Sequence, residues 1–387
     1  MTIQSMKCLL QFGLALATLS TLGCAALPDR LEGKNYPASE PPFIAPQVTQ
    51  AQGPGLQPAT GVLRHRLLLV GDAGVPRESE PVLEAVRRWG DAQPERTTVL
   101  YLGDNLYPAG LEADDRERGE AVLRAQVEAT TARKIFLPGN HDWGFPHQGP
   151  SRVVAQQRFI EANGAEFVPR EGCPGPSYRQ LAAPHEDGGR ALGAILIDID
   201  PWFVDASLRP TCPGVSTPAD LGRALSALLA EHSEEWLVVA AHHPLRTGGP
   251  HGGFSRGMIA DAVTGTIFLI YGSLQDSYEE GYRAIMRPIE AALTKSPPLL
   301  FAAGHDHNLQ VLEGGPHATW LAVSGAGATE RVRSGYVTSI EGTLFAHGHP
   351  GFMVLDIVQT ADGDRAFLSV IETGSEAPVF ELEAAHP

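Results

Sequence analysis

The segment Leu67-Leu68-Leu69-Val70-Gly71-Asp72-Ala73-Gly74 joins an uninterrupted apolar run to a Gly-Asp turn. Such a run is typical of a strand that is covered on both faces. Glycine lets the chain turn sharply after the strand, so the Asp72 carboxylate comes at the strand's carboxyl end. In open α/β sheets ligands bind at that end. The segment therefore predicts a buried strand that carries a polar side chain at a ligand-binding edge.

The same pattern recurs further along the chain, and each time an apolar run leads into residues that can ligate a metal. The four recurrences are Thr98–Leu102 before Gly103-Asp104-Asn105-Leu106-Tyr107, Lys134–Leu137 before Gly139-Asn140-His141-Asp142, Leu237–Ala241 before His242-His243-Pro244, and Leu299–Ala303 before Gly304-His305-Asp306-His307. Aspartate, asparagine and histidine supply oxygen and nitrogen ligands. Five such strand ends in order predict a metal site.

Helical patterns separate several of these runs. Apolar residues recur at helical spacing in Pro81–Trp89, Ala121–Thr131 and Leu221–Ala230, and further apolar runs occur at Ile195–Ile197 and Trp320–Val323. The C-terminal part, Gly351–Glu383, has the pattern of strands joined by a turn at Ala361–Asp364. The chain is therefore expected to form a layered α/β domain.

The composition is that of a folded acidic protein. The chain has 387 residues, of which 43% are hydrophobic and 19% charged, and 29 basic against 45 acidic residues give a net charge of −16. This length can bury a large core, which excludes global disorder. The negative charge argues against general nucleic-acid binding, because phosphate backbones attract lysine and arginine.

The N-terminus predicts export. Lys7 precedes the uncharged stretch Cys8–Leu27, and Gly23-Cys24 resembles a bacterial lipoprotein cleavage site. We expect a signal peptide over 1–24, of lipoprotein type, with a cleaved secretory signal and an uncleaved anchor as alternatives. The mature protein would be periplasmic, an outer-membrane lipoprotein or secreted, and its only membrane contact would be the anchor. A Pro-rich spacer over 25–60 and a catalytic domain over 61–387 would follow.

Two cysteines remain for the exported domain. Cys173 and Cys212 both lie in Pro/Gly loops. In an oxidising compartment they would form one disulfide, and the alternative is two unpaired loop thiols.

The complete motif set resembles the calcineurin-like metallophosphoesterases, and among them the purple acid phosphatases. Gly74 stands where other members carry a histidine, and Tyr107 follows Asp104 by three residues, as in that subgroup. The resemblance runs from about Arg66 to near the C-terminus. It implies the layered metallophosphoesterase fold, with two central mixed β-sheets flanked by helices.

The resemblance also implies a role for each motif residue. Asp72, Tyr107 and His307 would hold Fe(III); Asn140, His242 and His305 would hold Fe(II), Zn(II) or Mn(II); and Asp104 would bridge the two ions. His141 and His251 would bind the substrate and protonate the leaving group. The implied reaction is hydrolysis of a small phosphate ester by metal-bound hydroxide.

Two other functions remain open at this point. One is a phosphodiesterase or nucleotide phosphoesterase that uses two divalent ions, with Tyr107 merely packed. The other is an exported binding protein that keeps the fold without turnover.

Several conspicuous residues are given structural roles. His243 is interpreted as a neighbour of a ligand, His347 and His349 as loop residues, and Asp198 and Asp200 as capping or packing residues. Trp143 and Trp202 could equally line the pocket or pack. The stretch Phe254–Ser296, with its strand-like run Thr264–Tyr271, is hypothesised to overhang the active site and affect substrate size.

Overall fold

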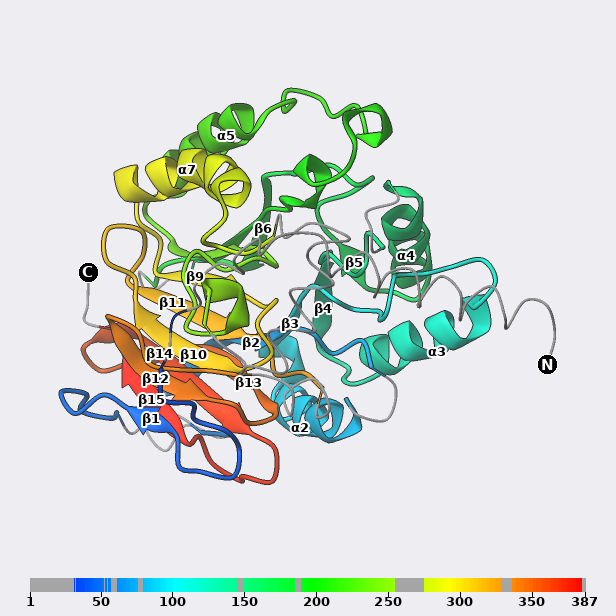
Figure 1. Cartoon of the computed structure of the whole chain (residues 1–387). Coiled ribbons are helices and arrows are strands. Elements are labelled where there is room, and N and C mark those ends of the chain that lie inside the picture. The colour runs from blue at the N-terminus through cyan, green and yellow to red at the C-terminus, as the bar shows by residue number, and fades with distance from the viewer. Residues whose placement is uncertain are drawn as a thin grey trace, which may run out of the picture.

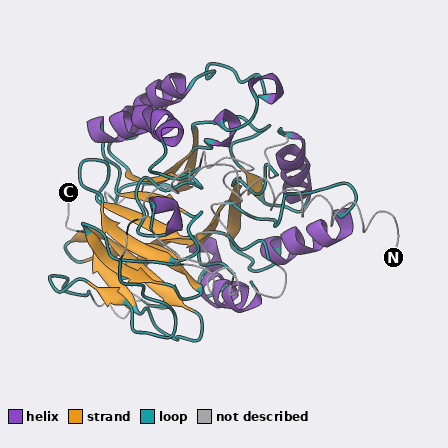
Figure 2. Ribbon diagram, viewed as in Figure 1, coloured by secondary structure: helices purple, strands orange, loops and turns teal. Residues whose placement is uncertain are grey.

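The computed structural model describes residue 31, residues 33–51, 53, 55–56, 61–75, 79–144, 149–184, 189–254, 275–328 and 336–384. They form two mixed β-sheets with helices on their outer faces (Figures 1 and 2). This arrangement confirms the expected fold class. The predicted signal peptide and the run 264–271 lie outside the described residues. In the part of the chain that is described, no helix is long and apolar enough to cross a membrane.

The first sheet has seven strands in the order β15-β14-β13-β2-β3-β4-β5. Its parallel strands are β2 (Val62–Val70), β3 (Thr97–Leu102), β4 (Arg133–Leu137) and β5 (Glu166–Phe167). Its antiparallel strands are β13 (Gly351–Thr360), β14 (Gly363–Glu372) and β15 (Phe380–Glu383). The carboxyl ends of β2, β3 and β4 therefore meet at one edge.

The second sheet has eight strands in the order β1-β12-β10-β11-β9-β8-β7-β6. Its parallel core is β7 (Leu192–Leu196), β8 (Trp236–Ala240), β9 (Leu300–Ala303) and β11 (Trp320–Ser324). The antiparallel strands are β1 (Phe43–Ile44), β6 (Ser177–Ala182), β10 (Leu309–Glu313) and β12 (Thr343–His347). The loops after β8 and β9 carry the remaining motif histidines.

Alternation along β2 explains why its sequence is apolar on both faces. Leu67 and Leu69 join the core between the sheets, together with Val238 of the other sheet. Leu68 and Val70 point the other way and pack under the helices. Side chains alternate with a period of two, so the segment Leu67–Val70, with helices on one face and a sheet on the other, is apolar on both faces.

The helices complete the outer layers of the molecule (Figure 1). α2 (Glu80–Gly90), α3 (Arg116–Val127) and α4 (Ser151–Ala162) contribute to the core on the outer face of the seven-stranded sheet. α5 (Pro218–Glu231) and α7 (Glu280–Lys295) pack on each other and on the eight-stranded sheet. Short 3-10 turns are η1 (Pro94–Arg96), η2 (Asp200–Trp202), η3 (Ala206–Leu208) and η4 (Pro250–Gly252).

Part of the Pro-rich range packs against the domain, whereas the sequence predicted a spacer over all of 25–60. Phe43 and Ile44 form β1 and pair with β12, and Ala45 is buried. Further along, the Ala51 amide donates to the carbonyl of Glu381 on β15. The range lacks a recognisable period because its strand is only two residues long.

The interpretation of His347 as a loop residue was wrong. It is the last residue of β12 and is buried, with Nδ1 2.5 Å from Glu372 Oε1 and Nε2 2.9 Å from the carbonyl of Glu40. Both nitrogens are thus engaged with acceptors of the protein. His349 does lie in a loop, with its ring 5.5 Å from that of His347 and its Nδ1 3.8 Å from Glu372 Oε2.

Cys173 and Cys212 form the expected disulfide, with Cα atoms 5.7 Å apart. The buried pair of acids after β7 also packs as expected. Asp198 Oδ2 accepts from the buried Trp143 indole, and Asp198 Oδ1 accepts from the Asp200 amide. Trp143 is therefore a core residue.

Candidate metal centre

Loops from both sheets bring the motif residues to one place. Asp72 follows β2, Asp104 follows β3, Asn140 follows β4, and His242 follows β8. His305 and His307 lie between β9 and β10. Asp72, Asp104 and His305 have φ values of 62°, 53° and 71°. Such left-handed conformations are uncommon for non-glycine residues and gather at functional sites.

The first group of donors surrounds the hydroxyl of Tyr107. This oxygen lies 2.7 Å from Asp104 Oδ2, 3.0 Å from Asp72 Oδ1 and 3.2 Å from His307 Nε2. Three buried oxygens and one nitrogen from the half-buried His307 thus converge. Hard oxygen donors of this kind suit a strongly Lewis-acidic ion.

The second group surrounds the side-chain oxygen of Asn140. Asn140 Oδ1 lies 2.9 Å from His242 Nε2 and 3.2 Å from His305 Nδ1, and the two ring nitrogens are 3.3 Å apart. The other nitrogen of His242, Nδ1, donates to the carbonyl of Leu102 at 2.8 Å. In a neutral ring Nε2 then presents a lone pair, and so does Asn140 Oδ1. Lone pairs that face each other at this distance are satisfied by a cation, so the residues fit a metal ion.

Asp104 connects the two groups. Its Oδ2 faces Tyr107, while its Oδ1 lies 3.4 Å from His242 Nε2 and accepts from the His141 amide at 2.9 Å. One ligand atom each from Asp72, Asp104 and His242 lie within 4.8 Å of one another, so these three buried residues could hold one ion. A carboxylate with one oxygen toward each donor group has the geometry of a bridging ligand.

The electrostatics of the cluster favour a cation. Burial raises the pKa of Asp72 to about 8, with a smaller contribution from the charge of Asp104. Burial also acts on Asp104, but the imidazoles of His242 and His141 and the Tyr107 hydroxyl outweigh it and hold the pKa of Asp104 below its usual value. A bound cation would replace the proton of Asp72.

Histidine protonation is disfavoured in the same place. Burial lowers the pKa of His305 well below its usual value, and the charges of His251, His243, His242 and His307 act in the same direction. A neutral imidazole is the form that binds a metal. The second donor group is therefore prepared as a ligand set.

His141 and His251 lie at the edge of the cluster. Their side chains are 25% and 24% exposed, whereas those of Asp72 and His242 are 0% and 1% exposed. The His141 ring packs on Tyr107 with centroids 4.4 Å apart, and the His251 ring lies 3.9 Å from that of His305. Both rings are therefore reachable from solvent at the edge of the donor atoms.

His243 is placed behind the cluster. It is fully buried, its ring lies 4.5 Å from that of His305, and its Nδ1 is 3.9 Å from Asp200 Oδ2. This places His243 directly beside the second donor group.

Three further acids support the site, and the sequence reasoning gave them no role. Asp142 accepts from the backbone amides of Gly139, Asn105 and Leu106, which ties two motif loops together. Asp306 contacts Thr247 Oγ1 and the His251 amide. The position of Asp142 in the Gly-Asn-His-Asp motif is a signal that could have identified it.

Asp276 is the third of these acids. Its Oδ1 lies 2.6 Å from His251 Nδ1. It is 25 residues away from His251 in the sequence. No local pattern marks it.

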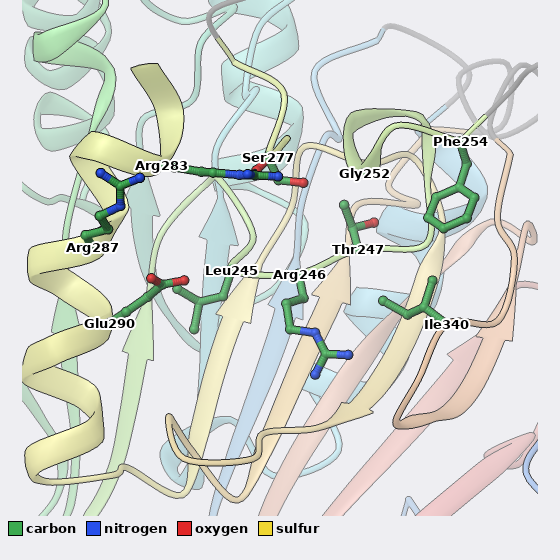
Figure 3. A pocket seen from close by; sticks show the side chains of 10 residues that line it. All are labelled: Leu245, Arg246, Thr247, Gly252, Phe254, Ser277, Arg283, Arg287, Glu290 and Ile340. Atoms are coloured by element: carbon green, nitrogen blue, oxygen red, sulfur yellow. The ribbon is translucent and has the colours of Figure 1, made fainter. Parts of the chain in front are cut away.

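A pocket of about 410 Å³ lies next to the η4 turn (Figure 3). It separates α7, which carries Arg283 and Arg287, from the segment after β8, which carries Arg246 and Thr247. No predicted metal ligand is among its lining residues. The pocket thus adjoins the His251 turn without being the metal centre itself.

Comparison with known proteins gives similarity at the level of structure. No family model matches the sequence, and no curated protein matches it. GAP50, the anchor in the inner membrane complex of Plasmodium, is 14% identical to this chain and has a TM-score of 0.54. The matched region covers 83% of this chain and 88% of GAP50. At this identity the likeness shows the fold and no activity.

Two enzymes show weaker similarity. The purple acid phosphatase of yellow lupin (Lupinus luteus) seeds is 13% identical and covers 84% of this chain, with a TM-score of 0.49. The NAD nucleotidase of Haemophilus influenzae is 11% identical and covers 80%, with a TM-score of 0.36. This chain spans only 55% of the length of each.

Proposed function

We propose that this chain is a phosphoric ester hydrolase with a binuclear metal centre, a phosphomonoesterase of the purple acid phosphatase type. The observation that carries the proposal is Asp104, which presents Oδ2 to the Tyr107 group and Oδ1 to the His242 group. Two adjacent donor sets joined by one carboxylate suit two ions that act together.

The assignment of ligands follows the two donor groups. Asp72, Tyr107 and His307 would hold Fe(III), and Asn140, His242 and His305 would hold Fe(II), Zn(II) or Mn(II). Such a pair of ions, when bound, supplies hydroxide as the nucleophile and neutralises charge on the phosphate.

The chain's own residues orient the substrate and manage its protons. The His141 ring is fixed because Nδ1 donates to the carbonyl of Pro108 at 2.6 Å, so its Nε2 is the nitrogen turned to other groups. His251 stands over His305 on the second donor group. In the proposed reaction the two histidines bind phosphate oxygens and give a proton to the leaving alkoxide.

The experiment is metal analysis and a visible spectrum of the purified protein, together with hydrolysis of p-nitrophenyl phosphate. Tyrosinate bound to Fe(III) absorbs visible light, so the protein is expected to be purple or pink and its Tyr107→Phe variant colourless. A colourless, active protein with two zinc or manganese ions would support the divalent phosphoesterase instead. Full metal occupancy without hydrolysis of monoesters or diesters would support a binding protein and overturn the proposal.

Export forms part of the same proposal, and the Cys173–Cys212 disulfide supports it because structural disulfides persist in oxidising compartments. Expression in a bacterium, followed by fractionation, tests the lipid anchor. The wild type is expected in the membrane fraction and the Cys24→Ser variant in the soluble fraction. A wild type found only in the medium would instead indicate a cleaved secretory signal.

A further inference from the structure

His251 is held by two consecutive residues, Asp276 and Ser277, that precede α7. The Ser277 amide and hydroxyl both donate to the carbonyl of His251, at 2.8 and 3.0 Å. Asp276 Oδ1 lies 2.6 Å from His251 Nδ1. One short segment thus fixes both the backbone and the ring of a residue at the edge of the metal centre.

The Asp276 carboxylate is itself fixed in place. Its side chain is only 2% exposed, and Tyr278 donates its hydroxyl to Oδ2 at 2.8 Å. Each carboxylate oxygen therefore has a partner among the described residues, and these two contacts fix the orientation of the carboxylate. A buried carboxylate without partners would be costly, so the geometry depends on both contacts.

The contact with Asp276 determines which part of His251 faces the site. The carboxylate accepts the Nδ1 proton, so a substrate can meet the ring only through Nε2. The same contact restrains rotation of the ring, which lies 3.9 Å from the ring of His305. Without it the ring would remain attached to a fixed backbone but could turn away.

We propose that Asp276 is a positioning residue that orients the imidazole of His251 toward the substrate. This inference rests on the proposed function, since it assumes that His251 contacts a phosphate ester. Asp276 acts through His251 and touches no reacting atom.

The fold offers a way to separate this role from a structural one. The η4 turn is held independently by Asp306, which contacts the His251 amide at 3.3 Å, and by Ser277. Truncation of Asp276 therefore releases the ring while the turn stays in place. Tyr278→Phe removes one contact of the Asp276 carboxylate and leaves the carboxylate in place. Asp276→Asn keeps the shape of the side chain and one acceptor oxygen.

The test is a double-mutant cycle on p-nitrophenyl phosphate hydrolysis with the metal-loaded protein. A small displacement of a catalytic group costs on the order of 100-fold, so Asp276→Ala should lower kcat by roughly 10- to 100-fold. Metal content should change little, and KM should rise no more than it does in His251→Ala. Asp276→Asn and Tyr278→Phe should lower kcat by a smaller factor than Asp276→Ala does. In the His251→Ala background, Asp276→Ala should add less than about twofold, because the two residues act as one unit.

Glu280→Gln is the matched control, because Glu280 is an exposed acid at the start of α7 that pairs with Arg287. It should leave kcat unchanged. A crystal structure of Asp276→Ala gives a readout that needs no activity, and it should show the His251 ring turned away from His305. Equal losses from Asp276→Ala in both backgrounds, or an unmoved ring, would overturn the inference. If instead the wild type hydrolyses no phosphate ester, the proposed function fails while the ring orientation still tests Asp276.

Discussion

The Nε2 atom of His242 lies 2.9 Å from Oδ1 of Asn140, although the two residues follow strands of different sheets. β8 belongs to the eight-stranded sheet and β4 to the seven-stranded sheet. The second donor group therefore exists only where the two sheets meet. Packing between the sheets thus brings its donor atoms together.

Substitution of Asn140 should remove one ion and leave the other. Asn140→Ala deletes the oxygen that faces both ring nitrogens, whereas the Tyr107 group keeps all of its donors. Loss of an indirect partner of a metal ligand already costs about 10- to 100-fold in affinity or activity, so a direct ligand should cost at least as much. The metal content, measured by metal analysis, should fall from two ions per chain toward one.

Asn140→Asp is the control for this experiment, because it retains an oxygen donor at the same place. It should bind metal better than Asn140→Ala. Equal metal content in the wild type and in Asn140→Ala would contradict the assignment of this residue as a ligand.

The sequence predicted the motif loops well because each has a local cause. An apolar run that is buried on both faces predicts a strand, and a glycine followed by a polar residue predicts its end, as at Gly71 and Asp72. Five such ends in order predicted a shared metal site, but not that three of them belong to the seven-stranded sheet and two to the eight-stranded sheet. The ligand roles themselves remain predictions until metal is measured.

Features that depend on distant parts of the chain could not be predicted in this way. Phe43 and Ile44 become a strand only because β12 offers them an edge. Asp276 becomes a partner of His251 only through the placement of the segment before α7. His347 ends an apolar run too short to stand out, and its partner Glu372 lies on another sheet.

A buried ion pair on β2 and β13 should be important for stability. Arg66 Nε and Nη2 each donate to one oxygen of Asp356 at 2.8 Å, and both residues are almost fully buried. Burial raises the pKa of Asp356, although Arg66 opposes this shift. Arg66→Met leaves the carboxylate without its partner, which should cost roughly 3–5 kcal/mol in the free energy of unfolding.

Urea unfolding of Arg66→Met, Asp356→Leu and the double variant measures this cost. The double variant should recover part of the loss, because replacing a buried ion pair by apolar residues is often nearly neutral. A loss below about 1 kcal/mol in Arg66→Met would mean that the pair contributes no more than an exposed one.

The disulfide should also stabilise the domain. Cys173 and Cys212 are 39 residues apart. Closing a loop of that length lowers the conformational entropy of the unfolded chain, which raises the free energy of unfolding by about 4 kcal/mol. The variant with both cysteines changed to alanine should be destabilised by that order. Reductant should destabilise the wild type to a similar extent and leave the variant unaffected; sensitivity of the variant to reductant would point to another cause.

The stability of the protein should fall in mild acid partly because of His65 on β2. Burial, with a smaller contribution from the positive charge of Arg133, lowers the pKa of His65 to about 4, and its Nε2 lies 3.0 Å from Thr98 Oγ1. The usual histidine pKa is about 6.5, so between pH 6.5 and 4 the unfolded chain binds more protons than the folded one. The contribution of His65 to the free energy of unfolding is therefore complete above pH 6.5 and is lost as the pH falls from 6.5 toward 4.

Between pH 7 and pH 5 this single group should contribute a loss of about 2 kcal/mol. Urea unfolding of the wild type and His65→Gln at the two pH values, at equal metal loading, separates the contribution of His65 from that of the other titrating groups. The decrease in the free energy of unfolding between the two pH values should be smaller in His65→Gln by that amount. Glutamine can still form a hydrogen bond with Thr98 but does not titrate. His317→Gln, in a turn before β11, is the control and should keep the wild-type decrease. Identical decreases in the wild type and His65→Gln would show that His65 is not the group responsible.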